Sequence, residues 1–460
     1  MKHPSKMNIL MIIPWMEMGG ADLFNLHIVE KINKEKFAVS IVCTQPAKNC
    51  WKHHFEKWTE NIWILPEFLK PEEYAAYIID LVGQKNIDLI FLSNSYYGYH
   101  LLPMLKCTYP QIAVVDYVHM EEWYWRTGGY ARLSGMLECC LDQTLVCNQQ
   151  TRNVLIDHFG RTSETVRTLY IGVDQNRFDN TRVPHGQIRA KYNIPDDKKV
   201  ILFPCRIHPQ KRPFLMLEIA KHVISRDENV CFFVAGDGPL LPELKDKISQ
   251  MKLNNWFVCT GEISEMEKVY ADSDLTLICS LKEGLSLTAY ESCAMATPVV
   301  SADVGGQKEL IDDTMGRLIP LHQKEEDLDS RVYSIEEIDA YTNAIFDVFA
   351  DKTRYDQMCC NCREKIERQF SCDQMIVQLE EIFRNTMGKV QSNQEQKQFP
   401  DYLMGWAKHY LETYLAYENA VNPNGNGEDL NLELKRIANS RLGKLAIKIL
   451  MKLKINKLFC

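Results

Sequence analysis

Short apolar runs alternate along the first part of the chain with longer amphipathic segments. The apolar runs lie at about 7–13, 38–43, 87–92, 112–118 and 143–147, and segments of helical length separate them. Continuous apolar runs joined by helical crossovers are typical of parallel strands that helices cover on both faces. The pattern therefore predicts a doubly wound parallel sheet.

A second series of the same kind begins after the polar stretch 179–187, with strands expected near 199–204, 230–234, 255–259, 275–278 and 298–301. We expect an α/β fold with two Rossmann-like doubly wound domains facing a central cleft, and a helical C-terminal tail. The expected parts are a first domain at 1–180, a second at 190–370, a crossover helix at 371–390, and the tail at 391–460.

Charge and cysteine content narrow the classes of function. The formal net charge is −8, and residues 441–460 carry six basic side chains and no acid, which leaves −14 for residues 1–440. An acidic body argues against nucleic-acid binding. Many of the sixteen cysteines lie inside apolar runs, which fits a reducing cytosol. A cysteine cluster at 359–372 lacks a second CxxC pair and a nearby histidine, so we expect no metal site.

Paired glycines follow the first strand. Gly19 and Gly20 open the next helix, and glycines there let backbone N–H groups approach an anion, although a tight turn needs glycine as well. The dinucleotide-binding pattern G-x-G-x-x-G is absent, and no acidic residue ends the strand at 38–43. A dehydrogenase is therefore not expected.

Two loops of the second domain carry further candidates. Arg206 and Lys211 follow the strand at 199–204. A guanidinium fork and an ammonium group five residues apart suit a diphosphate, and a solvated basic turn has the same pattern. Gly236 follows the strand at 230–234, where we expect glycine to serve the turn first and a ligand second.

The segment 280–298 contains more candidate binding and catalytic residues than any other loop. Glu283 leaves a strand, Glu291 lies deeper in the following helix, and three residues lie at the helix start: Gly284, Leu285 and Ser286. Backbone amides at such a start point outward, toward an anion or sugar oxygens. Eight helical residues span roughly 12 Å, more than the about 5 to 10 Å between the two carboxylates of a glycoside hydrolase. The pair therefore suits two parts of one extended ligand.

In order and spacing, these motifs resemble the group 1, family 4 glycosyltransferases with the GT-B fold. The resemblance covers about residues 7–387 and includes Asp303 to Glu309, D-V-G-G-Q-K-E. It implies that Arg206 and Lys211 bind the diphosphate of a nucleotide-sugar donor. It also implies that Glu291 binds the ribose hydroxyls, and Glu283 with the following amides the transferred sugar. Transfer with retention of configuration, without a metal or other cofactor, is implied as well.

On the opposing domain, His119 ends the strand at 112–118 and is similar to the family histidine that faces the acceptor. A histidine satisfied within the core has the same pattern. The chain departs from the family at Ile171, where asparagine is usual, at Arg212, where glycine is common, and at Asp22, where arginine or glutamate is frequent. These departures leave the donor and the acceptor contacts open.

The chain ends in RLGKLAIKILMKLKINKLFC. At 100° per residue its basic and apolar side chains fall on separate flanks, which predicts a helix on an anionic membrane surface or one that packs with its lysines in solvent. We therefore expect a cytoplasmic enzyme, or one on the inner membrane face, that moves a sugar to a saccharide or lipid-linked acceptor in cell-surface polysaccharide biosynthesis. The alternatives are a sugar-nucleotide epimerase and a catalytically silent sugar-nucleotide-binding scaffold.

Overall fold

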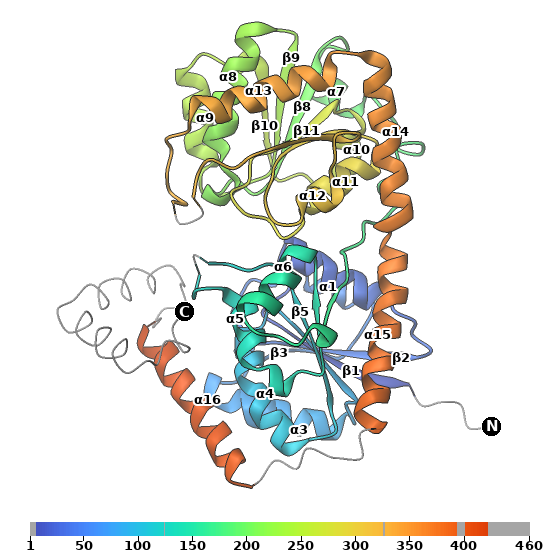
Figure 1. The fold of residues 1–460 in the computed structure, drawn as a ribbon, viewed down its shortest axis with the longest axis vertical. Coiled ribbons are helices and arrows are strands. Elements are labelled where there is room, and N and C mark those ends of the chain that lie inside the picture. Colours follow the sequence, from blue (N-terminus) through green and yellow to red (C-terminus); the bar gives the residue numbers. More distant parts are fainter. Residues whose placement is uncertain (1–5, 124, 325–326, 393–400, 422–460) are drawn as a thin grey trace, which may run out of the picture.

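The structure is a computed structural model that describes residues 6–123, 125–324, 327–392 and 401–421. These residues form two lobes, each built on a parallel sheet with helices on both faces (Figure 1). This confirms the predicted fold class. The basic segment 441–460 lies outside the described residues.

The N-terminal lobe contains a seven-stranded sheet in the order β3-β2-β1-β4-β5-β6-β7. Its strands are β1 (Met7–Ile13), β2 (Phe37–Cys43), β3 (Ile62–Ile64), β4 (Leu89–Ser93), β5 (Ala113–Val118), β6 (Gln143–Val146) and β7 (Val166–Thr168). Its helices are α1 (Gly20–Lys31), α2 (Lys52–Phe55), α3 (Tyr74–Gln84), α4 (Tyr96–Thr108), α5 (Gly129–Met136) and α6 (Gln149–Asn153).

The C-terminal lobe contains a six-stranded sheet in the order β10-β9-β8-β11-β12-β13. Its strands are β8 (Lys199–Pro204), β9 (Val230–Ala235), β10 (Phe257–Gly261), β11 (Leu275–Ile278), β12 (Val299–Ala302) and β13 (Gly316–Ile319). Its helices are α7 (Gln187–Lys191), α8 (Pro213–Arg226), α9 (Leu241–Gln250), α10 (Met266–Ala271), α11 (Leu287–Ala294), α12 (Gln307–Leu310), α13 (Ile335–Phe349) and α14 (Lys352–Gln369).

Both faces of each sheet are buried, which explains the apolar runs in the sequence. Successive side chains of a strand point to opposite faces. In β1, Ile9 and Met11 belong to one hydrophobic core, whereas Leu10 and Ile12 belong to the core on the other face. A strand between two cores needs apolar residues at both sets of positions, so the run is continuous rather than alternating.

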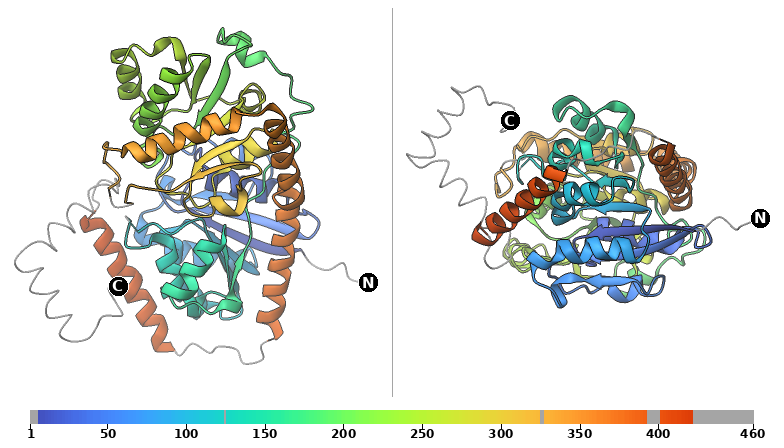
Figure 2. Two further views of the ribbon diagram at one scale, coloured as in Figure 1. Left: turned by 45° about the horizontal axis from the view of Figure 1, so that its top comes forward. Right: turned by 90° about the horizontal axis from the view of Figure 1, so that it is seen from below.

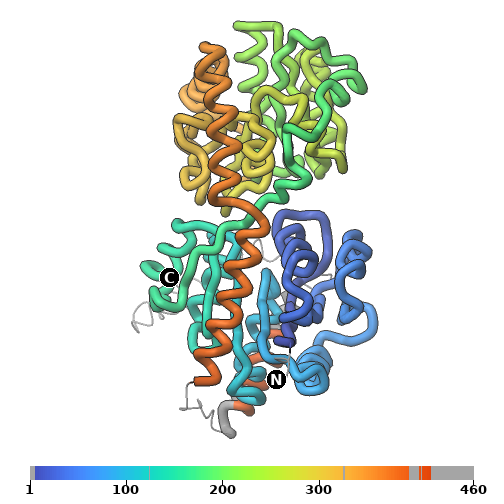
Figure 3. The backbone as a smooth tube through the Cα atoms, turned by 90° about the vertical axis from the view of Figure 1, so that its right-hand side faces the viewer, coloured from blue at the N-terminus to red at the C-terminus, as the bar shows by residue number. Residues whose placement is uncertain are grey.

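Two C-terminal helices pack on the N-terminal lobe. After α14, the chain continues into α15 (Cys372–Ser392), and the two helices form a column along both lobes (Figure 3). In α15, Phe383 contacts Phe91 with a ring-centroid distance of 5.4 Å. On the opposite side of the lobe, α16 (Asp401–Val421) packs against α4 (Figure 2), where Tyr414 stacks on His100. The last described helices therefore belong to the first lobe.

The ten strands predicted from the apolar runs are all present, to within about two residues at each end. Three short strands were not predicted: β3, β7 and β13. Each has three or four residues at an edge of its sheet. Among the described residues, no helix combines the length and apolar character needed to cross a membrane.

Candidate functional site

The candidate residues of the two lobes meet at one place, which we call the lobe junction. It is formed by the loops that leave β5 and β6 in one lobe and β11 and β12 in the other. Figure 1 shows α1 and α6 facing α11 and α12 across this junction. Asn148 Nδ2 donates to Gly284 O at 2.8 Å, and Gln149 N donates to both carboxylate oxygens of Glu309 at 2.9 and 3.0 Å. Ligands of such sheets bind beyond the carboxyl ends of the strands, and both sheets point these ends at the junction.

Gly284 lies at the point of closest approach. A Cβ atom at this position would be 2.0 Å from His119 O and 2.9 Å from Cys147 Sγ. No other residue type fits there unless the lobes separate. The glycine after Glu283 thus allows the loop of one lobe to lie against the backbone of the predicted histidine in the other.

A buried ion pair joins the lobes beside Gly284. Lys282 Nζ lies 2.8 Å from Glu121 Oε1, and the side chains are only 7% and 2% exposed. Glu121 also accepts a hydrogen bond from Thr151 Oγ1 at 2.8 Å. The two ends of this pair are neighbours of candidate residues, since Lys282 precedes Glu283 and Glu121 follows His119 by two positions.

Glu283 and Lys211, both predicted donor ligands, form an ion pair. Lys211 belongs to a 3-10 turn, Pro209–Lys211, that follows β8. Glu283 is buried and also accepts a hydrogen bond from Ser280 Oγ at 2.6 Å. The two loops are held side by side by Gln210, whose carbonyl accepts from Leu281 N at 2.8 Å and whose Nε2 donates to Lys282 O at 2.9 Å. A cation and a carboxylate are thus placed together at the ends of adjacent strands.

Arg206 lies on the same loop as Lys211. Its side chain is exposed and forms no ion pair or hydrogen bond with any other described residue. A free guanidinium five residues before an ammonium group is able to bind an anion with several oxygens.

The start of α11 provides hydrogen-bond donors. Within the described part of the chain, the N–H groups of Gly284 and Leu285 donate to no protein acceptor, whereas Ser286 N donates to Gln307 Oε1 at 3.3 Å. Because α11 begins at Leu287, Glu283 precedes the helix, and the rise of a helix does not measure its separation from Glu291.

Glu291 lies in the second turn of α11, in a different environment from Glu283. Tyr270 OH donates to Glu291 Oε2 at 3.0 Å. Burial raises the pKa of Glu291 to about 7, and the Tyr270 hydrogen bond opposes this rise only in part. The hydroxyl of Tyr270 therefore orients a carboxyl group whose pKa is close to neutral pH.

His119 follows β5 and packs among aromatic rings. Its ring centroid is 5.3 Å from that of Phe24 in α1, with the planes nearly perpendicular, and Nε2 lies 3.3 Å from Ser93 Oγ. Burial lowers the pKa of His119 to about 3, so the imidazole is neutral at physiological pH. A neutral ring offers one donor and one acceptor nitrogen to a ligand rather than a positive charge.

The remaining predicted glycines line the edges of the site. Gly20 opens α1, and a Cβ there would lie 3.1 Å from Leu287 Cδ1, so the start of α1 touches the start of α11. Gly19 is the N-cap residue of the same helix. Gly236 has φ 145°, and a Cβ would be 1.9 Å from Cys205 O, so its glycine is required for packing against the Arg206 loop. Contact of these glycines with a donor stays a prediction.

The sequence analysis did not identify four residues at or near the site: Glu121, Asn148, Tyr270 and Lys282. Asn148 and Glu121 lie two and three positions after the ends of β6 and β5, where candidate residues are expected in a doubly wound sheet. No local pattern distinguishes Tyr270, because its role depends on contact with a helix that begins seventeen residues later.

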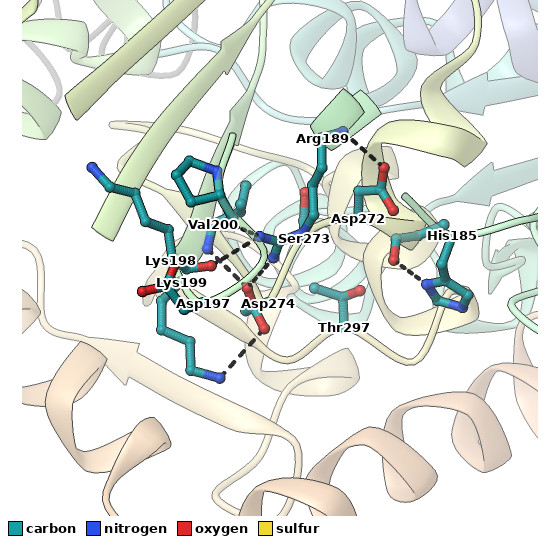
Figure 4. Close-up of polar contacts among 12 residues, drawn as sticks. His185, Arg189, Asp197, Lys198, Lys199, Val200, Asp272, Ser273, Asp274 and Thr297 are labelled. Carbon is teal, nitrogen blue, oxygen red and sulfur yellow. Dashed lines mark hydrogen bonds and ion pairs between the residues drawn. The ribbon is translucent and has the colours of Figure 1, made fainter. Parts of the chain in front are cut away.

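A second polar cluster lies at the amino-terminal ends of the central strands β8 and β11 (Figure 4), beside a surface cavity of about 570 Å³. Asp274 precedes β11, accepts from Val200 N at 2.8 Å, and pairs with Arg189 at 2.8 Å. Asp272 accepts from the N–H groups of Ile188 and Arg189 at the start of α7. Because these carboxylates are occupied by protein donors, the cluster is structural. Within the described ranges, no group of three or more His, Cys, Asp or Glu is arranged to hold a metal ion.

Two family models match the chain. A model described as glycosyl transferases group 1 matches residues 185–345, and one described as glycosyltransferase family 4 matches residues 18–177. They coincide with most of the C-terminal and N-terminal lobes, respectively.

Known proteins agree with these models. The alpha-D-kanosaminyltransferase of Streptomyces kanamyceticus is 29% identical over 157 residues, which are 34% of this chain and 40% of that protein. An Escherichia coli enzyme, UDP-Gal:alpha-D-GlcNAc-diphosphoundecaprenol alpha-1,3-galactosyltransferase, is 22% identical over 248 residues, 53% of this chain and 60% of that protein. The chain thus spans less than two thirds of either relative.

The fold is similar to that of Anabaena HepE, solved in complex with UDP and glucose. The TM-score is 0.66 at 17% identity, and the match covers 82% of this chain and 100% of that one. The two family models show that the chain belongs to the group 1, family 4 glycosyltransferases, and the structural similarity shows that it has their GT-B fold.

Proposed function

We propose that this protein transfers a sugar from a nucleoside-diphosphate sugar to a saccharide or lipid-linked acceptor, with retention of configuration. The observation that carries the proposal is the ion pair of Lys211 and Glu283 on adjacent loops beside the lobe junction, with the unpaired Arg206 on the same loop as Lys211. An anionic diphosphate and a polar sugar fit the two kinds of group on these adjoining loops.

Transfer of the sugar requires stabilisation of the negative charge on the departing nucleoside diphosphate. Arg206 and Lys211 bind its phosphate oxygens, and the N–H groups of Gly284 and Leu285 add donors that need no rearrangement at the moment of transfer. In this proposal these groups suffice without a metal ion. Glu283 binds hydroxyl groups of the transferred sugar, and Glu291 those of the ribose.

His119 faces the sugar from the other lobe. Because its imidazole is neutral, it donates or accepts a hydrogen bond at the reacting sugar and does not contribute a positive charge. The backbone contact between His119 and Gly284 keeps this ring next to the donor loop only while the lobes are closed.

The acceptor class rests on two arguments. The Escherichia coli relative acts, by its name, on a diphosphoundecaprenol-linked sugar. In addition, the basic segment 441–460 has the composition of a helix that lies on anionic lipid. Both favour a saccharide acceptor at the inner membrane face, in cell-surface polysaccharide biosynthesis.

A binding screen tests the donor site. Purified protein is titrated with UDP, GDP, ADP and TDP, and we expect one of them to raise the melting temperature, since it binds only the folded state. Arg206→Met and Lys211→Met should each weaken the affinity about tenfold or more, because hydrogen bonds to charged groups contribute about 1.5–3 kcal/mol. Lys352→Met, an exposed lysine of α14, is the matched control and should change nothing. Absence of binding by every nucleotide would contradict the proposal.

An activity assay distinguishes a transferase from an epimerase and from a catalytically silent scaffold. With the preferred nucleotide sugar, transfer should require an acceptor and give a product of unchanged anomeric configuration by NMR. An epimerase would act without acceptor, and a scaffold would bind without turnover. Deleting 441–460 should abolish binding to anionic vesicles while donor hydrolysis continues; vesicle binding by the deletion variant would contradict the membrane part.

A further inference from the structure

Arg212 follows Lys211 and has an unusual combination of properties. Its backbone is left-handed, with φ 50° and ψ 57°, at a helix N-cap position. Its side chain is 1% exposed and pairs with Glu337 at 2.8 Å, and Glu337 is also 1% exposed. One of its guanidinium nitrogens, Nη2, has no hydrogen-bond partner among the described residues.

These properties give the fold little or no stability that an apolar residue would not give. A left-handed backbone costs a non-glycine residue about 1 kcal/mol or more. A buried ion pair is often no more stable than apolar residues of the same size, and an unpaired buried N–H adds a further cost. Stability therefore does not account for an arginine at this position, and strain of this kind tends to gather at functional sites.

The contacts of Arg212 connect the two donor loops. Nε donates to Cys279 O at 2.5 Å, at the exit of β11, and Nη1 donates to Glu337 at 2.8 Å in the first turn of α13. The next residue after Cys279 is Ser280, which donates to Glu283. One guanidinium thus links the loop that carries Lys211, the loop that carries Glu283, and helix α13 of the same lobe.

We propose that Arg212 is a positioning residue that holds the Lys211 ammonium at the diphosphate position. The proposal rests on the donor site proposed above. Lys211 has a flexible stem with four carbons, so its placement depends on the backbone that bears it. The Arg212 fork anchors that backbone at two separate points, whereas a lysine offers a point charge without the second, directed bond.

The decisive variant is the double replacement Arg212→Met with Glu337→Leu. Apolar residues of similar volume replace a buried ion pair at little cost or with a gain in stability, whereas a single replacement leaves one charge buried and unpaired. The double variant therefore keeps the lobe folded while it removes the anchor of Lys211. Arg226→Met, at the exposed end of α8, is the matched control.

Calorimetry measures the affinity of each variant for a nucleoside diphosphate and for the corresponding nucleoside. We expect the double variant to lose about tenfold in affinity for the diphosphate and nothing for the nucleoside, because Lys211 meets only phosphate. Adding Lys211→Met to the double variant should cause no further loss, since both changes act through one ammonium. A general distortion of the lobe would weaken both ligands instead.

Two results would overturn the inference. One is equal diphosphate affinity in the wild type and the double variant, and the other is a parallel loss for nucleoside and diphosphate. If the double variant does not fold, the same comparison is made with Arg212→Lys, which keeps a cation beside Glu337 and should still weaken diphosphate binding selectively. Failure of the wild type to bind any nucleotide would instead contradict the proposed function.

Discussion

Glu283 and Glu291 have identical side chains in different surroundings. Glu283 contacts the cation of Lys211 and the hydroxyl of Ser280. Glu291 accepts a hydrogen bond from the neutral hydroxyl of Tyr270, and burial raises the pKa of Glu291 to about 7. The two carboxyl groups therefore differ in the donors that orient them.

This difference predicts the effect of Glu291→Gln. A raised carboxyl pKa means that the folded chain holds a proton that the unfolded chain releases, so stability falls as pH rises from about 4.5 through 7. Glutamine is neutral at every pH. We expect the variant to be more stable than the wild type at pH 8, by at most about 3 kcal/mol, and equally stable at pH 4.5 to 5.

Chemical denaturation at both pH values measures this effect. A wild-type advantage at pH 8 would show that Glu291 is ionised at little cost. In a donor assay the same variant should still lose affinity, because an amide offers one acceptor oxygen where the carboxylate offers two. The opposite signs of the stability and binding effects would mark Glu291 as a ligand-binding group.

At the scale of elements, the loops that leave β5, β6, β8 and β11 contain most of the candidate site residues. The sequence predicted the strands before these loops because their apolar runs are buried on both faces. It also placed His119 and Glu283 at strand ends. The edge strands β3, β7 and β13 were not predicted, because three or four residues are too few to form a recognisable run of apolar residues.

The loop between β11 and α11 predicts a steric test. In Gly284→Ala the new methyl group would overlap His119 O, so either the loop or the lobe must move. We expect the free energy of unfolding to fall by about 1–3 kcal/mol. The rate of sugar transfer, measured with donor and acceptor together, should fall at least tenfold.

Gly388→Ala is the control for this test. Gly388 is exposed in α15, and its added methyl group meets nothing within 4 Å. Alanine in the middle of a helix should stabilise the chain by about 0.5–1 kcal/mol without any effect on transfer. Equal activity of the two variants would show that the contact between the lobes is not needed for catalysis.

For the molecule as a whole, closure of the lobes depends on polar contacts. The Lys282–Glu121 pair is buried between them, and Asn148 and Glu309 add hydrogen bonds across the junction. Separation of the lobes returns both charges to water, which offsets the loss of their attraction. Contacts of this kind favour one closed arrangement while allowing the lobes to part.

Glu121→Gln should shift this balance toward separated lobes. The amide keeps the shape of the side chain but removes the negative charge that faces the buried Lys282 ammonium, and opening of the lobes relieves the cost of that loss. Small-angle X-ray scattering should record a larger radius of gyration than in the wild type. Asp356→Asn, which removes an exposed pair on α14, should leave the radius unchanged. An unchanged radius for Glu121→Gln would mean that the other junction contacts suffice for closure.

By itself, the sequence determined the two doubly wound sheets and most of the candidate positions. A strand that is buried on both faces has a continuous run of apolar residues, which can be recognised in the sequence. In a parallel sheet the carboxyl ends of all strands lie on the same side, so the loops that follow them come together. Only the tertiary structure decided the partners: Lys211 with Glu283, Glu121 with Lys282, and Arg212 with Glu337 are 72, 161 and 125 residues apart. No local pattern encodes such pairs, because they depend on how loops from separate strands, and from separate lobes, come together when the chain folds.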